Sequence, residues 1–223
     1  ENKFIKINQN SKLYYPNLRI TRVLLDEKYF LEHLYDSYLL NNIDFNDQDL
    51  VIDCGANVGE LFLSIKSNNP NIQYIGFEPD DQVFECLQLN TNSKSSNICL
   101  SNESGEKNFF IDSLGANSSV YESEPGMDFM VVKVEKLENL YPDTEIKLLK
   151  IDAEGSELEV LEGSKKIFNN IDYISVDCGA EKGINQDTTF VDVNNYLISN
   201  NFSLIGINQN RLIFAKNTKQ SDH

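Results

Sequence analysis

Apolar and polar positions along the chain follow two alternating patterns. Residues 50–52, 72–77 and 148–151 are mainly apolar runs of strand length, and each is followed by turn residues. The segment after the first run instead places Leu61 and Ile65 four positions apart, on one face of a helix. Repeated strand–turn–helix units of this kind predict an α/β domain with a doubly wound, mostly parallel sheet whose central strands are buried on both faces.

The first part of the chain predicts a small N-terminal extension over residues 1–47. Alternating apolar residues between positions 4 and 15, interrupted by a polar break, predict a hairpin. Asp26 is placed to cap an amphipathic helix that runs to Leu40. An aromatic stripe on this helix is more typical of core packing than of a sugar-binding face. Its members are Tyr29, Phe30, Tyr35 and Tyr38.

Two later segments interrupt or close the alternation. Residues 106–135 hold two extended stretches around a loop, 114–126, that is rich in glycine, serine and asparagine. We expect a hairpin-like excursion here, with the loop covering the functional site. Residues 202–207 and 211–215 predict a closing antiparallel hairpin, and residues 217–223 form a polar tail.

Composition limits the classes of function that fit. The chain has 223 residues and a formal net charge of −16, which argues against a nucleic-acid substrate because no basic stripe is present. No apolar run is long enough to span a membrane and no signal peptide is visible, although the first residue is Glu1 and not Met. The cysteines Cys54, Cys86, Cys99 and Cys178 form no C-x-x-C pair, so we expect free thiols and a cytoplasmic protein. With only two histidines, a histidine-rich metal site is excluded.

A glycine turn follows the first apolar run. Asp53 ends the strand, and Gly55 and Gly59 enclose Ala56 and Asn57 before the next helix. Glycine permits a sharp turn and close approach of a ligand, and the helix N-terminus offers free N–H groups. The dinucleotide fingerprint G-x-G-x-x-G is incomplete here. The spacing instead resembles the first motif of class I S-adenosylmethionine methyltransferases, D/E-x-G-x-G/N-x-G, which makes all five residues candidates for cofactor binding.

Polar residues also follow the second and third predicted strands. Glu78 and Pro79 end the second strand, where an acidic side chain can accept hydrogen bonds from both ribose hydroxyls of an adenosine group. This signal suits NAD equally well. Asp80 is placed to cap the next helix. Ser101 and Asn102 follow the third strand along the chain, predicted at residues 97–100, and are candidates for the edge of the adenine, or else turn residues.

The most specific stretch is residues 146–163, where an apolar strand runs into an acidic turn. Lys150 and Asp152 are expected on one face of this strand, where they can pair. The run Lys-Ile-Asp-Ala-Glu-Gly-Ser-Glu from Lys150 resembles the signature of the FkbM-type methyltransferases, and the resemblance covers roughly residues 48–216. It implies one Rossmann-like domain with a sheet of seven strands and S-adenosylmethionine as methyl donor. It also implies a hydroxyl acceptor on a sugar or a secondary metabolite.

Methyl transfer to an alcohol needs a group that accepts the hydroxyl proton. With histidine scarce, the candidates are carboxylates. Asp152 is the first choice for this base, and Glu154 and Glu181 follow. Asp152 is also a candidate for cofactor binding, because its carboxylate could interact with the sulfonium. A divalent cation between Asp152 and Asp177 is an alternative that the spacing does not demand, so no metal site is predicted.

The leading hypothesis is therefore an S-adenosylmethionine-dependent O-methyltransferase. Its acceptor would be a small molecule or glycan: a hydroxyl of a carbohydrate, such as a surface polysaccharide, or of a secondary metabolite. An NAD-dependent oxidoreductase is the second hypothesis, disfavoured by the missing glycine and by the absence of a downstream Tyr-x-x-x-Lys. A catalytically silent methyltransferase fold that serves as an interaction module is the third. The sequence leaves the acceptor and the oligomeric state open.

Overall fold

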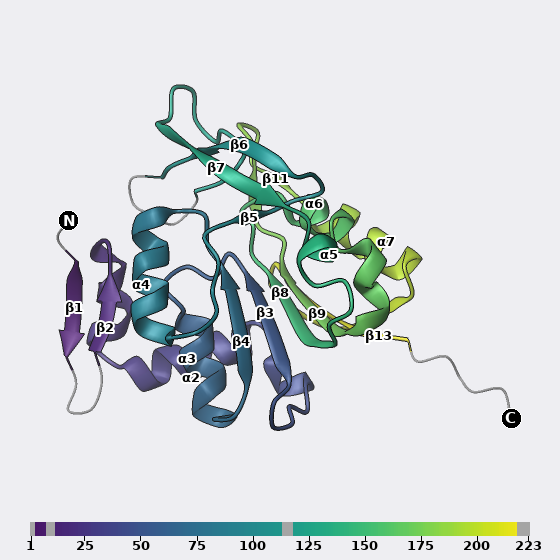
Figure 1. Ribbon diagram of the computed structural model, residues 1–223, viewed down its shortest axis with the longest axis horizontal. Helices are drawn as coiled ribbons and strands as arrows, with labels where there is room; N and C mark the ends of the chain where they lie inside the picture. The colour runs from purple at the N-terminus through teal and green to yellow at the C-terminus, as the bar shows by residue number, and fades with distance from the viewer. Residues whose placement is uncertain (1–2, 8–11, 113–117, 218–223) are drawn as a thin grey trace, which may run out of the picture.

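The computed structural model describes residues 3–7, 12–112 and 118–217. Within these residues the main sheet has six strands (Figure 1), in the order β12 (Phe202–Asn208), β13 (Arg211–Lys216), β9 (Ile171–Asp177), β8 (Ile146–Ile151), β3 (Leu50–Cys54) and β4 (Gln73–Phe77). The last four strands run parallel to one another, and β13 is antiparallel to both of its neighbours. The protein is therefore an α/β protein with a mixed sheet.

Helices cover both faces of the main sheet. One face carries α2 (Glu27–Ser37), α3 (Glu60–Asn68) and α4 (Asp81–Thr91), and the other carries α5 (Leu137–Leu140), α6 (Glu157–Glu162), the 3-10 helix η3 (Lys165–Asn170) and α7 (Phe190–Ser199) (Figure 1). Successive strand residues point to opposite faces, so Val51 and Leu148 pack with the first group, whereas Ile52 and Leu149 pack with the second. None of the helices in the described residues is long and apolar enough to cross a bilayer.

The segment after α4 leaves the main sheet, which has six strands in the described residues where the sequence predicted seven. This segment joins β4 through an isolated bridge between Phe77 and Ser96. The side-chain amide of Asn97 then donates to the carbonyl oxygens of Glu78 and Pro79, both at 3.0 Å. Beyond this one parallel bridge the segment forms no ladder with β4, so β4 is the edge strand of the main sheet in the described residues.

A smaller sheet lies beyond the carboxyl ends of β3 and β4 (Figure 1). Its strands are β5 (Cys99–Leu100), β7 (Phe129–Glu135) and β6 (Gly105–Phe110), in that order. The antiparallel pairing of β6 with β7 confirms the predicted hairpin-like excursion. The third predicted strand thus survives only as β5, which pairs with the excursion.

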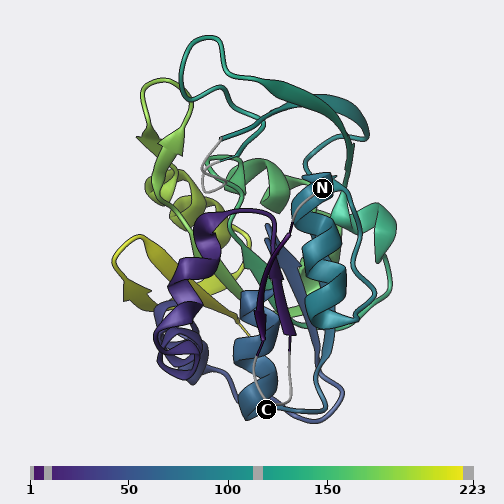
Figure 2. The same cartoon turned by 90° about the vertical axis from the view of Figure 1, so that its left-hand side faces the viewer.

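The N-terminal extension shares a core with α4 and the glycine turn. It contains the predicted hairpin, β1 (Phe4–Ile7) with β2 (Lys12–Tyr15), followed by η1 (Leu18–Ile20) and α1 (Thr21–Leu24). Figure 2 shows the hairpin beside α4, where Asn90 exchanges hydrogen bonds with the backbone of Tyr14. One apolar cluster joins the extension to the rest of the protein: Leu13, Tyr15, Ile20, Val23, Val58, Val83 and Cys86.

Helix α2 begins at the predicted cap. The side chain of Asp26 accepts a hydrogen bond from the backbone N–H of Tyr29 at 2.9 Å. Its aromatic stripe divides between core and surface: Tyr35 and Tyr38 are buried, whereas Tyr29 is 67% exposed. The short 3-10 helix η2 (Leu40–Asn42) then leads toward β3.

Gly55 packs directly against the backbone that follows β8. Its φ is +73°, and a Cβ added there would lie 1.9 Å from the carbonyl oxygen of Asp152. Alanine would combine backbone strain of about 1–2 kcal/mol with overpacking of about 1–3 kcal/mol. We therefore expect Gly55→Ala to lower the free energy of unfolding by about 2–5 kcal/mol, measured by urea denaturation.

Gly183 provides the matched control. Its φ is also positive, +66°, but an added Cβ would meet no atom within 4 Å. Gly183→Ala should therefore show only the strain, about 1–2 kcal/mol. An equal decrease in the free energy of unfolding in the two variants would contradict the close contact between the glycine turn and the end of β8.

Candidate active site

A cavity of about 370 Å³ opens at the carboxyl ends of β3, β4 and β8. Its volume lies in the range of small-molecule sites. The strand ends form one wall, and the smaller sheet with its loop forms another through Phe109, Ile111, Ser118 and Val120. The expectation that the 114–126 loop covers the site is confirmed for Ser118 and Val120, while residues 113–117 lie outside the described part of the chain.

The glycine turn connects the end of β3 to the end of β4. Gly55 and Asn57 have φ values of +73° and +48°, a region that glycine adopts freely and asparagine tolerates. The N–H groups of Gly55 and Ala56 both donate to the carbonyl oxygen of Phe77 at 3.0 Å. The N–H of Asn57 donates to the carboxylate of Glu78 at 3.0 Å. The turn therefore holds Glu78 in place.

Glu78 presents a carboxylate, 7% exposed, to the cavity. One oxygen accepts the N–H of Asn57 and the other accepts the N–H of Asp80, each at 3.0 Å. Burial nevertheless raises the pKa of Glu78 to about 7. Each oxygen keeps capacity for a further donor, so hydroxyl groups in the cavity can still bind here. Asp80 itself caps α4, as predicted, by accepting from the N–H groups of Gln82 and Val83.

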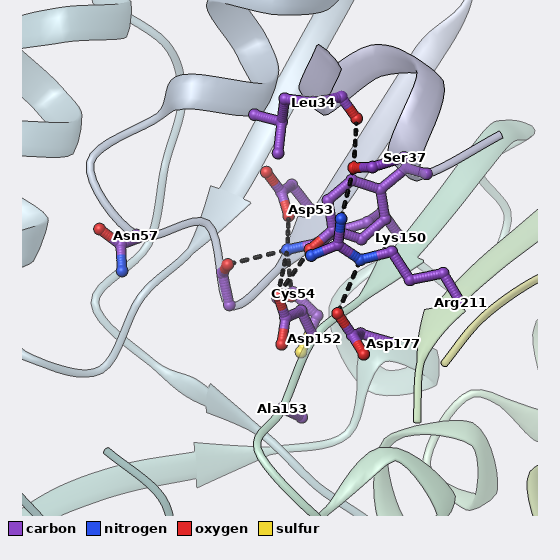
Figure 3. A network of polar contacts seen from close by, with 12 residues as sticks. Leu34, Ser37, Asp53, Cys54, Asn57, Lys150, Asp152, Ala153, Asp177 and Arg211 are labelled. Atoms are coloured by element: carbon purple, nitrogen blue, oxygen red, sulfur yellow. Dashed lines mark hydrogen bonds and ion pairs between the residues drawn. The ribbon is translucent and has the colours of Figure 1, made fainter. Parts of the chain in front are cut away.

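A buried ion pair joins β8 to β3. The ammonium nitrogen of Lys150 lies 2.8 Å from Oδ1 of Asp53, and the two side chains are 3% and 0% exposed. The same ammonium donates to the carbonyl oxygens of Cys54 at 3.3 Å and Gly55 at 2.9 Å (Figure 3). The hydroxyl of Tyr74 donates to the other oxygen of Asp53 at 2.5 Å. Asp53 therefore lies beneath the turn as the partner of Lys150.

The carboxylate of Asp152 is hydrogen-bonded to Tyr38, which packs against Arg211 from the other end of the chain. The hydroxyl of Tyr38 donates to its Oδ2 at 2.6 Å, while Lys150 lies 4.0 Å from the same oxygen in the longer of the lysine's two ion pairs. The guanidinium of Arg211 lies over the Tyr38 ring at 4.0 Å, and its Nε donates to Asp177 at 2.7 Å. Burial, reinforced by the charge of Asp152, raises the pKa of Tyr38, so its hydroxyl stays protonated and can donate.

Three carboxylates gather where β8 turns toward α6. Oxygens of Asp152, Glu154 and Glu181 lie within 4.8 Å of one another. Glu181 belongs to β10 (Ala180–Lys182), which pairs with β11 (Asp187–Thr188). Burial, followed by the charges of Asp152 and Glu181, raises the pKa of Glu154 to about 10. Burial also raises the pKa of Glu181. The cluster therefore holds a proton at neutral pH, because like charges this close disfavour full ionisation.

The same three oxygens have the spacing of ligands for a divalent cation. The alternative considered from the sequence placed a cation between Asp152 and Asp177. In the structure Asp177 is instead the partner of Arg211. Any cation bound at this end of β8 would therefore involve Glu154 and Glu181.

Most residues predicted for the site line the cavity: Asp53, Gly55, Ala56, Asn57, Glu78, Pro79, Asp152 and Glu154. Gly59 begins α3 behind the turn, and Glu181 reaches only the carboxylate cluster. The structure does not bring Ser101 and Asn102 to the cavity. Ser101 is 4% exposed, and the amide of Asn102 donates to Glu162 at 2.7 Å. Residues 98–100 form the wall at that point instead.

Sequence reasoning missed the cavity residues that lie outside the central motifs. Tyr38 and Arg211 come from the two ends of the chain, and Arg19 and Arg22 come from the extension. The aromatic stripe of α2 marked Tyr38 as buried but gave no sign of its bond to Asp152, which is 114 positions away.

The carboxylate of Glu78 lies beside a glycine turn at the ends of two neighbouring parallel strands. This arrangement is the one that binds the adenosine part of a cofactor. The class of protein is therefore an α/β enzyme with a nucleoside cofactor. Residues 53–204 match the Methyltransferase FkbM domain, more than half of the chain. The chain belongs to this family and is an S-adenosylmethionine-dependent methyltransferase.

Two relatives are methyltransferases. Hexuronic acid methyltransferase AglP of Haloferax volcanii is 28% identical over 142 residues, which cover 60% of this chain and 57% of that protein. Methyltransferase sdnD of Sordaria araneosa is 26% identical over 190 residues, which cover 67% of this chain and 71% of that protein. The chain thus matches little more than half the length of AglP. These relatives favour the methyltransferase hypothesis over the oxidoreductase.

Two solved structures of methyltransferases match the chain at low identity. Precorrin-6y C5,15-methyltransferase from Geobacter metallireducens has a TM-score of 0.48 and 11% identity, and the match covers 87% of this chain and 92% of that one. TrmK of M. capricolum, in complex with S-adenosylhomocysteine, has a TM-score of 0.45 and 14% identity, and the match covers 83% and 68% of the two chains.

The residues of the cavity fit S-adenosylmethionine. The carboxylate of Glu78 can accept hydrogen bonds from ribose hydroxyls, and the apolar wall at residues 98–100 can receive the adenine. Gly55 lines the cavity and has no side chain, so a ligand can approach the backbone of the turn closely. The neighbouring carboxylates match the positive sulfonium and ammonium groups of this cofactor.

Cofactor affinity should rise with pH across the neutral range. Ribose hydroxyls donate to a carboxylate, so binding favours the ionised form of Glu78, whose pKa is about 7. The dissociation constant of S-adenosylhomocysteine should fall about tenfold between about pH 6 and about pH 8. Calorimetric titration of wild type and Glu78→Gln with S-adenosylhomocysteine tests this. The variant should bind more weakly, and its dissociation constant should not change over this pH range. The same pH step in both proteins would assign it to another group.

The same pKa has the opposite effect on stability. The carboxyl of Glu78 titrates near 7 in the folded protein and near 4.5 when exposed. The contribution of this carboxyl to the free energy of unfolding is therefore fully present below about pH 4.5 and is lost as the pH rises through about 7. Glu78→Gln should gain up to about 3 kcal/mol over wild type between these limits. A stability difference that does not change with pH would show that this carboxyl is not shifted.

Proposed function

We propose that the protein transfers the methyl group of S-adenosylmethionine to a hydroxyl of a carbohydrate, with hydroxyls of secondary metabolites as the other acceptor class. The observation that carries this proposal is the Asp152 carboxylate, which lines the cavity and is 23% exposed. A sugar hydroxyl is a neutral nucleophile and needs a proton acceptor of this kind. The hexuronic acid acceptor in the name of the relative AglP supports the same class.

Bound S-adenosylmethionine supplies a methyl group on a positively charged sulfur, which leaves as a neutral thioether. The residues of this chain have to align the acceptor hydroxyl with that methyl group and remove its proton. Asp152 accepts the proton as the new carbon–oxygen bond forms. Tyr38 occupies Oδ2 of Asp152, which leaves Oδ1 for the acceptor hydroxyl.

Glu154 has a different task from Asp152. With a pKa of about 10 it is protonated at neutral pH and cannot serve as a base there. Its buried Oε2 has no hydrogen-bond partner among the described residues. In the protonated state Glu154 can donate a hydrogen bond to an oxygen of the acceptor. Burial, with the charges of Asp152 and Glu181, keeps it in that state.

Residues 48–216 form the methyltransferase domain, and residues 1–47 complete its cavity, while the tail at 217–223 has no assigned role. Among the described residues all four cysteines are free, in keeping with the cytoplasmic location expected from the sequence.

A mass-spectrometric screen tests the acceptor class. The protein is incubated with S-adenosylmethionine and a panel of uronic-acid oligosaccharides, neutral oligosaccharides and hydroxylated metabolites. We expect a sugar that gains one methyl group as an ether, stable to mild alkali, with Asp152→Asn as the inactive control. Methylation of metabolites alone, or an alkali-labile methyl ester on a uronate, would reject the sugar hydroxyl while leaving the family assignment intact.

Substitutions in the carboxylate cluster separate a base from a cation site. Asp152→Asn keeps the size but loses the charge, so the methylation rate should fall by at least about 10²-fold. Glu154→Gln resembles the protonated form and should keep most of the activity. Excess EDTA should leave wild-type turnover unchanged. If EDTA and Glu154→Gln both abolish turnover, a divalent cation holds the cluster and Asp152 is its ligand.

A further inference from the structure

Two arginines of the N-terminal extension line the cavity. Arg19 lies in η1 and Arg22 in α1, and both border the same space as the glycine turn and Glu78. They lie outside residues 53–204, the part that matches the family. In a chain with a net charge of −16, two neighbouring cations at a cavity wall suit an anionic group of a ligand.

The backbone that carries these arginines is firmly held. The side chain of Asn17 accepts a hydrogen bond from the N–H of Arg19 at 3.0 Å and so begins η1. Ile20 and Val23, on the same two turns, are 6% and 0% exposed within the cluster that joins the extension to α4. The extension therefore presents its arginines from a fixed position and not from a loose terminus.

The other cations of the cavity already have partners. Lys150 pairs with Asp53 at 2.8 Å, and Arg211 pairs with Asp177 at 2.7 Å. Arg22, in contrast, makes no ion pair with any residue that the structure describes. It is therefore the cavity cation that an incoming anion can pair with most directly.

Arg22 borders the cavity together with Glu60, the first residue of α3. Burial and the charge of Arg19 lower the pKa of Arg22, while Glu60 and Tyr15 oppose this shift. Glu60 is the first residue of α3, and Tyr15 fixes it with a hydroxyl hydrogen bond of 2.7 Å. Two guanidinium groups that repel each other beside an open cavity gain stability when an anion binds between them.

S-adenosylmethionine has one anionic group, the carboxylate of its methionine part. Glu78 and the apolar wall at residues 98–100 receive the adenosine part at one end of the cavity. Asn57 joins Glu78 to the glycine turn, and the turn leads into α3 beside the arginines. We propose that Arg22, with Arg19 beside it, binds the methionine carboxylate of S-adenosylmethionine, so that the N-terminal extension completes the cofactor site.

The anion that Arg22 binds could instead be a carboxylate on the methyl acceptor. The cofactor is the favoured source, because Arg22 borders the same cavity as the glycine turn and Glu78. The proposal rests on the cofactor assignment but not on the acceptor. A binding measurement without acceptor therefore separates the two sources.

The test compares two ligands that differ only in the carboxylate. The full chain is titrated in a calorimeter with S-adenosylhomocysteine and with its decarboxylated analogue, which keeps the adenosine, thioether and ammonium groups. Arg22→Gln should weaken S-adenosylhomocysteine about tenfold to a hundredfold and leave the affinity for the analogue unchanged. Arg22→Lys keeps the charge but not the two-pronged geometry, so its loss should be intermediate.

Lys28→Gln is the matched control, because it removes a cation of the extension that is 85% exposed and outside the cavity. It should change neither affinity. An equal loss for both ligands in Arg22→Gln would overturn the proposal in favour of a structural role. Unchanged S-adenosylhomocysteine affinity would also overturn it, and a raised KM for a uronate acceptor would then identify the acceptor as the source. If wild type binds neither ligand, the cofactor assignment fails, and the proposal fails with it.

Discussion

The buried ion pair of Lys150 and Asp53 is the constraint on which the site depends. The two residues lie opposite each other on the paired strands β8 and β3. Neither can lose its partner cheaply, because breaking a buried pair costs about 3–5 kcal/mol. Lys150 also donates to the carbonyl oxygens of Cys54 and Gly55, so the same ammonium holds the end of β3 and the first residue of the turn. Its value lies in register and cavity shape more than in net stability.

The cavity assigns different protonation states to chemically similar groups. Burial gives Glu78 a pKa of about 7, and burial with two acidic neighbours gives Glu154 a pKa of about 10. Asp152 instead receives a hydroxyl donor from Tyr38 and lies 4.0 Å from the ammonium of Lys150. The acidic wall therefore carries less charge than its composition suggests until a cationic cofactor enters. Pairs of carboxyl groups separated by environment in this way can divide donor and acceptor tasks.

Local patterns in the sequence predicted the features that depend on neighbouring residues. The apolar run ending at Asp53, the turn after it and most of the cofactor side of the cavity have such signatures. The loss of the edge strand could not be predicted, because the bonds that hold this segment at the end of β4 join Asn97 to residues 18 and 19 positions away. Alternation along β8 pointed Lys150 toward Asp152, whereas the pairing of β8 with β3 selects Asp53. Tyr38 had a recognisable place in a helix but no local sign of its partner.

Ser37 and Arg211 are hydrogen-bonded across 174 positions of the chain. The entropy cost of closing a loop grows with its length, and proteins rich in such distant contacts fold slowly. Arg211 belongs to the last strand of the main sheet. During synthesis, β3 and β4 with their glycine turn leave the ribosome long before this strand does. The contacts of Tyr38 with Asp152 and Arg211 therefore become complete only after β13 has been synthesised, and an unfinished chain lacks this part of the cavity.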